Sequence, residues 1–428
     1  MLAALLTIVL VLAGAVSGGA QEPDAPSIMP PRLAYLDGPV AFWRPGADRW
    51  APAEPNTALA PGDQIRTRHA GTAELQIGSR AFVRAWGDTA LAVIDQASDS
   101  LQLRIGDGHV VADLRTLEPG GILHVETPGG FFTLDRPGYY RVDVTARATS
   151  LTTRRDGRAI TTRIEGGRSQ SDLAAGLDAW DRWNQTRTDD LIQSASARYV
   201  GDGVYGVRDL DEHGDWRVLP TYGAVWLPRG APAGWAPYTT GRWTWDPRFA
   251  WTWVDTAAWG WAPFHHGRWV NLDGVWAWAP GPLVARPIYA PALVAFFAAP
   301  GARATVTAPL VSWVALGWGE PVMPWWGRAG FAARPTWFGW AGPHVVNNAV
   351  VSRTAVVQAS DIRVYRNVNV DRAVVAVPPD RFGRGRVEDA RVTAVDTRRL
   401  EPARGPLRVV APEPGRIEPP ARLERRGS

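Results

Sequence analysis

Two short motifs in this sequence carry residue types that ligand chemistry uses, and each lacks part of its usual context. Residues 201–206 (GDGVYG) have the glycine spacing of a dinucleotide-binding turn. That turn needs a strand before it and a helix after it, whereas the flanking sequence predicts a helix before it and β structure after it. Asp209, Asp211 and His213 begin like a calcium loop, but its twelfth residue, Pro220, cannot supply a bidentate carboxylate. We therefore expect neither nucleotide nor calcium binding here.

The composition excludes several classes of enzyme. The chain has no cysteine, and all 46 of its Lys and Arg residues are arginine. This rules out thiol catalysis, thiolate metal sites and Schiff-base lysines. No serine lies in a G-x-S-x-G turn. Paired carboxylates for glycoside hydrolysis stay open, because their separation is a three-dimensional quantity. We expect a protein that is not an enzyme and that holds no cofactor or metal.

Tryptophan is the most informative residue type in the chain. The phrase GWAPYTTGRW (234–243) returns as GWAPFHHGRW (260–269), and the segment 216–340 holds 18 of the 23 tryptophans. Such a repeat suggests a duplicated supersecondary unit. Indoles either form a core or stack on ligands from the surface. We expect most of the 18 to be core and the rest to contribute to a binding surface, whose candidates are Trp235, Tyr238, Trp243, Trp245, Trp261, Phe264, His265, His266, Trp269 and Trp276.

The histidine pair His265-His266 lies inside the second copy of the repeat. Adjacent side chains on a strand point to opposite faces, so the two imidazoles would not converge on one metal ion. We expect one imidazole to pack on the aromatic cluster and the other to meet solvent. The first copy has Thr239-Thr240 at these positions, so the fold does not demand histidine there. A specific role in the second copy stays open.

The elements that position these residues are mainly β. Between residues 32 and 168, apolar and polar residues alternate, as in Leu101-Gln-Leu103-Arg-Ile105, which predicts strands with one buried face. Asp156-Gly157 predicts a type I′ hairpin turn. From 171 to 198 the apolar spacing changes to three and four, with Ser171-Asp172 as a cap, which predicts a connecting helix.

Beyond this helix the sequence predicts a second β part. Gly and Pro recur every few residues from 199 to 345, and pairs such as Trp243-Thr-Trp245 favour short strands, so this segment is predicted to be a tryptophan-rich repeat module. Residues 346–380 are predicted to extend it. Residues 381–428 are rich in Pro and Arg, carry 12 Arg against 7 acidic residues, and are predicted to be disordered.

The first 20 residues predict export. An apolar run ends in Gly18-Gly19-Ala20, which is typical of a signal peptide cleaved before Gln21, although no Lys or Arg precedes the run. A retained N-terminal anchor is the alternative. We expect a periplasmic or cell-surface location in a Gram-negative bacterium. Nucleic acid is not an expected partner, because the excess charge lies in the tail rather than on a folded face.

Two parts of the chain resemble known bacterial domains. Residues 33–46 (LAYLDGPVAFWRPG), 59–78 (LAPGDQIRTRHAGTAELQIG) and 126–144 (ETPGGFFTLDRPGYYRVDV) resemble the FecR-type domain. The phrases YGAVWLP (222–228) and VSWVALGWGEPVMPWW (311–326), together with the repeat, resemble a tryptophan-rich domain of unknown function that often follows FecR-type domains in exported proteins. The resemblance implies a FecR-like β domain at 32–168. The sigma-factor signalling of FecR itself is not implied, because no internal membrane span or cytoplasmic segment is predicted.

These observations favour an exported, non-catalytic envelope protein that binds or scaffolds. Its partner would be an unidentified envelope protein or glycan, and the Arg-rich tail could contact anionic envelope polymers through charge. Three alternatives stay open: a carbohydrate- or peptidoglycan-binding module, a periplasmic signalling partner, and a cryptic hydrolase.

Overall fold

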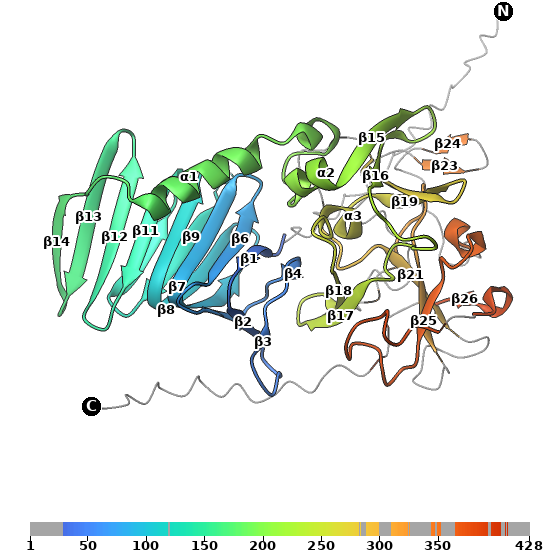
Figure 1. Cartoon of the computed structure of the whole chain (residues 1–428), viewed down its shortest axis with the longest axis horizontal. Coiled ribbons are helices and arrows are strands. Elements are labelled where there is room, and N and C mark those ends of the chain that lie inside the picture. The colour runs from blue at the N-terminus through green and yellow to red at the C-terminus, as the bar shows by residue number, and fades with distance from the viewer. Residues whose placement is uncertain are drawn as a thin grey trace, which may run out of the picture.

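The protein is mainly β and has two halves that lie side by side (Figure 1). A computed structural model describes residues 29–118, 120–281, 283, 288–298, 310–323, 325, 344–346, 349–351, 364–392, 395–403, 407 and 409. We call residues 29–192 the N-terminal β domain and residues 195–409 the tryptophan-rich module. The predicted signal peptide (1–20) and the end of the predicted tail (410–428) lie outside the described residues. In the part of the chain that is described, no helix has the length and apolarity that crossing a membrane requires.

The N-terminal β domain is built on one 14-stranded sheet. Its longest path runs β14-β13-β12-β11-β8-β7-β5-β2-β3. Off this path, β6 pairs with β7 and continues to β1 and β4, and β9 pairs with β8 and continues to β10. The predicted alternation is confirmed, since Leu101, Leu103 and Ile105 are buried on β8 while Arg104 is exposed. The strands are β1 (Arg32–Asp37), β2 (Val40–Trp43), β3 (Ala51–Pro52), β4 (Thr57–Ala58), β5 (Gln64–Thr67), β6 (Thr72–Gly78), β7 (Ala81–Gln96), β8 (Ser100–Leu114), β9 (Ile122–Thr127), β10 (Gly130–Leu134), β11 (Gly138–Val144), β12 (Ala148–Arg155), β13 (Arg158–Glu165) and β14 (Arg168–Leu173).

The turn between β12 and β13 confirms the predicted hairpin. Asp156 has φ 54° and Gly157 has φ 72°, so both central residues are in the left-handed region that a type I′ turn requires. Gly166 and Gly167 repeat this geometry between β13 and β14, with φ 55° and 74°. Two tight turns in succession hold β12, β13 and β14 in one antiparallel ladder.

The connecting helix is shorter than the predicted 171–198, and the prediction is wrong at both ends. Residues 168–173 pair with β13 as β14, so tertiary pairing overrides the helical spacing there. Helix α1 runs Ala179–Ile192 and begins at Asp178, whose side chain forms a reciprocal capping box with Asp181. A separate 3₁₀ turn, η1 (Ala195–Tyr199), follows. Helix α1 lies across one face of the sheet (Figure 1) and buries polar residues, namely Asp181, Asn184 and Thr188.

The tryptophan-rich module contains several small antiparallel sheets. The repeat appears as two hairpins, β17-β18 and β19-β20, which confirms a duplicated unit. The sheets have the orders β15-β16-β20-β19, β17-β18, β25-β22-β21-β26 and β23-β24. The elements are α2 (Val207–His213), β15 (Gly214–Leu219), β16 (Gly223–Pro228), β17 (Gly241–Asp246), β18 (Ala250–Asp255), α3 (Ala262–His265), β19 (Arg268–Leu272), β20 (Val275–Ala279), β21 (Val294–Ala298), β22 (Val311–Ala315), β23 (His344–Val346), β24 (Ala349–Val351), η3 (Arg366–Asn369), β25 (Val375–Val377), η4 (Thr397–Arg399) and β26 (Glu401–Pro402).

This module extends beyond its predicted boundary. Strands β25 and β26 flank β22 and β21, and Phe382 and Val387 are buried in the module core. The Val387 amide donates to the Gly241 carbonyl over 2.8 Å. The packed structure therefore continues past residue 380, into a segment whose Pro and Arg content predicted disorder.

The two halves meet in a polar and aromatic interface. An apolar cluster there joins Ala58 of the N-terminal β domain to Tyr205, Trp261 and Tyr289 of the module. Charged and amide side chains surround it with direct contacts across the interface. These are Arg32 Nη2 to Asp209 Oδ2 at 2.5 Å, Arg44 Nη1 to the Trp245 carbonyl at 2.9 Å, Asn56 Nδ2 to the Ala257 carbonyl at 2.7 Å, and Arg248 Nη2 to the Leu59 carbonyl at 2.6 Å.

Candidate functional site

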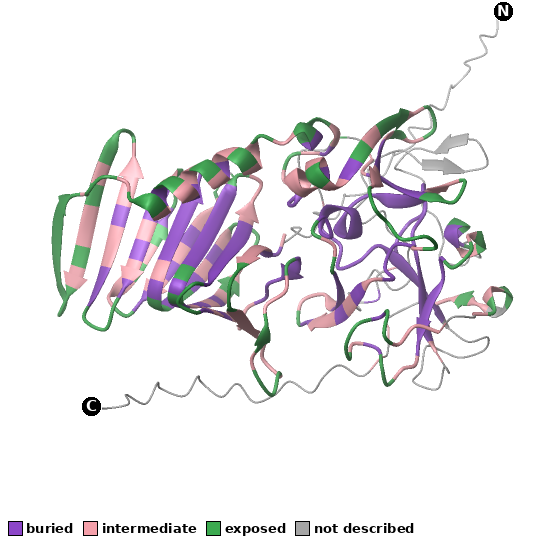
Figure 2. Ribbon diagram, viewed as in Figure 1, coloured by how far each residue is buried: buried purple, intermediate pink, exposed green. Residues whose placement is uncertain are grey.

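The residues predicted to form a binding surface are mostly buried in the module, whose interior strands are coloured as buried in Figure 2. Only Trp235 and Trp245 are half-buried, and both pack against the core cluster. The other eight are buried: Tyr238, Trp243, Trp261, Phe264, His265, His266, Trp269 and Trp276. Trp243, for example, contacts five aromatic rings, those of Trp253, Phe296, Trp313, Trp325 and Phe382. The structure thus assigns these residues to packing, and the prediction that they form a binding surface is wrong for the eight that are buried. The broader expectation, that most of the clustered tryptophans are core, fits the described ones.

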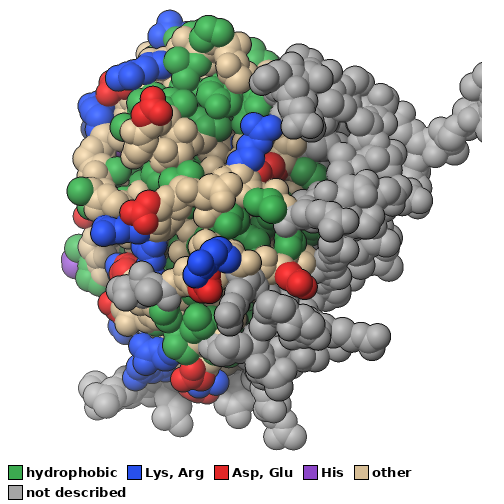
Figure 3. Space-filling view, turned by 90° about the vertical axis from the view of Figure 1, so that its right-hand side faces the viewer, with side chains coloured by type: hydrophobic (Ala, Val, Ile, Leu, Met, Phe, Trp, Pro, Cys, Tyr) green, Lys and Arg blue, Asp and Glu red, His purple; other side chains and the backbone are tan. Residues whose placement is uncertain are grey.

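Among the described residues, the surface of the module exposes no tryptophan. Its exposed large hydrophobic residues are Val218, Val275, Leu283 and Val364. Figure 3 shows hydrophobic side chains mixed with Arg, Asp and Glu on the described part of the end of the module. The described surface of the module therefore lacks the platform of exposed indoles that the repeat predicted.

His265 and His266 are both buried, so the prediction that one imidazole meets solvent is wrong. The helical turn α3 forms where a strand was predicted, with Pro263 in its first turn, and it carries the pair inward. His265 Nδ1 lies 2.8 Å from the Ala290 carbonyl, and its ring stacks on Tyr289. Burial lowers the pKa of each histidine to about 3, so both imidazoles are neutral at pH 7. The described residues hold no group of three metal-ligating side chains.

Helix α2 explains the two motifs that were set aside. The glycines at 201–206 precede this seven-residue helix, so the expectation of β structure directly after them is wrong, but η1 rather than a strand comes before them. Asp209 Oδ2 forms an ion pair with Arg32 Nη2 at 2.5 Å, and Asp211 Oδ1 accepts a hydrogen bond from the Ser196 amide over 2.8 Å. The two carboxylates serve the interface and η1 instead of a calcium loop.

An aromatic groove lies elsewhere, in the N-terminal β domain between α1 and the sheet. It is open and has a volume of about 430 Å³, within the usual range for small-ligand sites. Its lining combines four aromatic side chains with two carboxylates at the rim. The residues are Tyr35, Asp37, Thr72, Trp86, Asp178, Ala179, Trp180 and Trp183.

The aromatic rings form a continuous row along the groove. Trp180 stacks on Trp183 at 4.9 Å and 10°, and on Trp86 at 5.3 Å and 25°. Tyr35 extends the row from Trp183, and His109 extends it from Trp86. Trp86 is 37% exposed, while Tyr35, Trp180 and Trp183 are half-buried. The row therefore leaves part of its aromatic surface accessible to solvent, chiefly at Trp86.

A buried ionic network beside this groove ties α1 to the sheet. Glu74 of β6 accepts from Arg84 Nε at 2.7 Å and from Arg187 Nε at 2.6 Å. Arg84 donates in turn to Thr188 Oγ1 of α1 over 2.9 Å. The Arg187 guanidinium lies 4.0 Å from the centre of the Tyr35 ring, a cation–π contact. These contacts fix α1, and with it Trp180 and Trp183, against the sheet.

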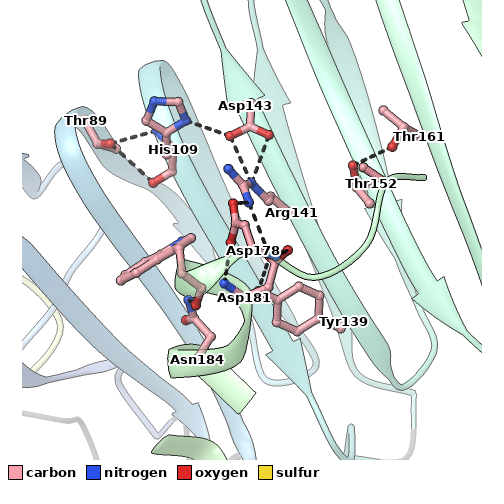
Figure 4. A network of polar contacts seen from close by, with 12 residues as sticks. Thr89, His109, Tyr139, Arg141, Asp143, Thr152, Thr161, Asp178, Asp181 and Asn184 are labelled. Atoms are coloured by element: carbon pink, nitrogen blue, oxygen red, sulfur yellow. Dashed lines mark hydrogen bonds and ion pairs between the residues drawn. The ribbon is translucent and has the colours of Figure 1, made fainter. Parts of the chain in front are cut away.

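A second network holds the N-terminus of α1 (Figure 4). Arg141 Nη1 lies 2.6 Å from Oδ2 of Asp178, the capping residue, and Arg141 Nε lies 3.1 Å from Oδ2 of Asp143. His109 Nδ1 lies 2.6 Å from Asp143 Oδ1. The pKa of His109 is raised, chiefly by its hydrogen bond with Asp143. Burial raises the pKa of Asp178, but hydrogen bonds from Arg141 and backbone amides outweigh it, so the net shift is downward.

Sequence reasoning missed this groove, although part of the signal was present. Trp180 and Trp183 are three residues apart and so share one face of a helix. Tyr35 and Trp86 come from β1 and β7, and nothing local in the sequence brings them to that helix face. The arrangement suits binding, because partly exposed rings offer apolar contact surface and the exposed carboxylate of Asp37 can accept hydrogen bonds.

The fold and the groove define a two-part β protein with a rigid aromatic site on its N-terminal half. Residues 207–320 match the family described as "Family of unknown function (DUF6600)". The match begins at α2, includes both repeat hairpins and ends just beyond β22. No FecR-type family matches the N-terminal β domain. The comparison with curated proteins found no match.

Proposed function

We propose that this chain is an exported, non-catalytic binding protein of the cell envelope, and that the aromatic groove is its ligand site. The row Tyr35–Trp183–Trp180–Trp86 carries this proposal, because it contains Trp86, the one exposed tryptophan among the described residues. The N-terminal β domain is FecR-like in this proposal, and the tryptophan-rich module serves as its packed support.

A glycan segment is the ligand class that the groove fits best. Sugar rings have apolar C–H faces that pack on aromatic rings and hydroxyl groups that donate to carboxylates. Asp37, which is exposed, supplies such an acceptor. Its negative charge disfavours anionic polymers and favours neutral or amino sugars.

The described groove supports binding better than hydrolysis. Glycoside hydrolysis requires a carboxylic acid that stays protonated beside a carboxylate. The pKa of Asp178 is held below its ordinary value, and its carboxylate is occupied by Arg141 and the Asp181 amide. Asp178 thus serves as a fixed acceptor and helix cap instead of a proton donor.

The test is binding of the purified full chain to chito-oligosaccharides and to insoluble peptidoglycan. Tryptophan fluorescence should change on titration with the soluble sugar, and Trp86→Ala should weaken binding at least about tenfold, as expected for loss of one stacking ring. Trp50→Ala is the matched control: it removes a half-buried indole of the same domain that lies outside the groove. Absence of binding to both glycans, or equal weakening by the two variants, would reject the glycan proposal.

A further inference from the structure

Strand β14 forms a free edge of the 14-stranded sheet. It ends the strand order and pairs only with β13 (Figure 1). All six of its residues are exposed, and Leu173 is 91% exposed. The strand contains neither proline nor lysine, two residues that commonly protect sheet edges. This edge is therefore open to pairing with another strand.

The hydrogen-bonding register shows which backbone groups of β14 are free. The two-residue turn at Gly166-Gly167 makes Glu165 and Arg168 a hydrogen-bonded pair, and such pairs recur at every second residue. Arg168, Gln170 and Asp172 therefore direct their backbone groups toward β13. Ser169, Ser171 and Leu173 direct theirs outward, to the open edge.

The side chains of β14 are self-complementary about Gln170. Reading outward from this residue, Ser169 and Ser171 come first, and Arg168 and Asp172 come next. We propose that β14 pairs antiparallel with β14 of a second copy of this chain, around a two-fold axis at Gln170. Arg168 of each copy then lies opposite Asp172 of the other, and opposite charges across strands attract.

The free backbone groups fit this same register. With Gln170 opposite its own copy, Ser169 lies opposite Ser171 of the second copy, so the outward-facing residues form hydrogen-bonded pairs. Arg168 and Asp172 fall at non-hydrogen-bonded positions, where facing side chains approach most closely. Backbone geometry is compatible with this register, and the charge pattern selects it among the registers that the backbone allows.

Neighbouring registers lose the charge match. A two-fold axis at Ser171 would place Arg168 opposite Ala174, and an axis at Ser169 would place Asp172 opposite Gly166. In the proposed register Arg168 lies between Glu165 on β13 and Asp172 of the second copy. Within the described part of the chain, Arg168 and Asp172 form no ion pair, and Asp172 accepts a hydrogen bond from Gln170 Nε2 over 3.0 Å, so both charges remain available.

Charge exchange between copies tests the proposal. Sedimentation velocity on the mature full chain should show a concentration-dependent dimer. Arg168→Asp alone places Asp opposite Asp, and Asp172→Arg alone places Arg opposite Arg, so each should weaken dimerisation at least about tenfold. An equal mixture of the two single variants restores both opposite-charge pairs and should dimerise again.

Folding is not at issue for these variants, because both positions are exposed. Arg158→Asp, an exposed charge reversal on β13, is the matched control and should leave the dimer intact. A wild-type chain that stays monomeric up to its solubility limit would overturn the proposal. So would a dimer that survives both single variants, or a mixture that fails to recover.

Discussion

Arg84 and Glu74 meet in the interior of the N-terminal β domain, with Arg84 Nε 2.7 Å from Glu74 Oε2 and both side chains at most 1% exposed. Arg187 of α1 reaches the same carboxylate from the helix. Burial alone would raise the pKa of Glu74, but the two guanidinium groups outweigh it and lower the pKa. One carboxylate thus couples the sheet to the helix that carries half of the aromatic groove.

Removal of this carboxylate should be costly. Glu74→Ala leaves the buried Arg84 guanidinium without its counter-charge, and loss of one partner of a buried pair costs about 3–5 kcal/mol of unfolding free energy. Urea unfolding at neutral pH measures this. Glu126→Ala is the control, because its pair with Arg104 is solvent-exposed and such pairs contribute at most about 1 kcal/mol. Similar losses for both variants would contradict the buried network.

Asp255 should make stability depend on pH. Burial raises its pKa to about 7, although the Ala257 amide and Trp253 Nε1–H donate to its carboxylate. The folded state then binds a proton more tightly than the unfolded state, whose pKa is near 3.8. Stability therefore falls as pH rises between these values, by at most about 1.4 kcal/mol per pH unit.

The comparison with Asp255→Asn isolates this titration. The variant carries no charge at this position at any pH. The difference between its unfolding free energy and that of the wild type should therefore increase in favour of the variant as pH rises from about 4 to about 7. Chemical unfolding of both proteins across this range gives the difference. Two pH profiles that run parallel would show that Asp255 ionises at its ordinary pKa.

Truncation to alanine should lower the unfolding free energy much more at Trp243 than at Trp86. Trp243 is 1% exposed and packs among five aromatic rings, so Trp243→Ala should cost about 3–5 kcal/mol of unfolding free energy. Trp86 is 37% exposed, so Trp86→Ala should cost clearly less and act mainly on ligand binding. Thermal unfolding of the two variants tests the ranking, and a reversed order would refute the assignment of core and groove.

His109 should report its bond with Asp143. Because this bond raises the pKa, the imidazole should titrate above 6.5 in a histidine NMR titration, and Asp143→Asn should lower the value. A raised histidine pKa stabilises the fold fully below the unfolded pKa, and this contribution is lost as pH rises through the folded pKa. Asp172→Asn, an exposed change on the same face of the sheet, should leave the titration unchanged. No difference between the two variants would exclude the bond in solution.

Local sequence pattern was sufficient for many elements of the fold. Alternation at Leu101, Leu103 and Ile105 predicts β8, and Asp156-Gly157 predicts the turn between β12 and β13. Pattern failed where pairing or a local start signal decided the outcome. The prediction started a helix at residue 171, but residues 168–173 form β14 because they pair with β13. Residues 262–265 form α3 instead of the expected strand, with Pro263 in the first turn.

The candidate site was harder to predict, because burial depends on the whole fold. The repeat reveals a duplicated hairpin, but it does not tell a core indole such as Trp243 from an exposed one such as Trp86. The groove gathers Tyr35, Trp86 and the pair Trp180 and Trp183 from three separate elements. Only the docking of α1 on the sheet, through Glu74, places them together.

The contacts across the two halves have a practical consequence for anyone preparing the protein in pieces. The side chains of Arg32, Asn56 and Arg248 each donate a hydrogen bond to an atom of the opposite half. Ala58 shares an apolar cluster with Trp261. Cleavage between residues 192 and 195, followed by separation of the fragments, would expose these polar and apolar groups to solvent on both fragments. Neither fragment would keep the surface it has in the intact chain, so the natural unit for expression and measurement is the whole polypeptide.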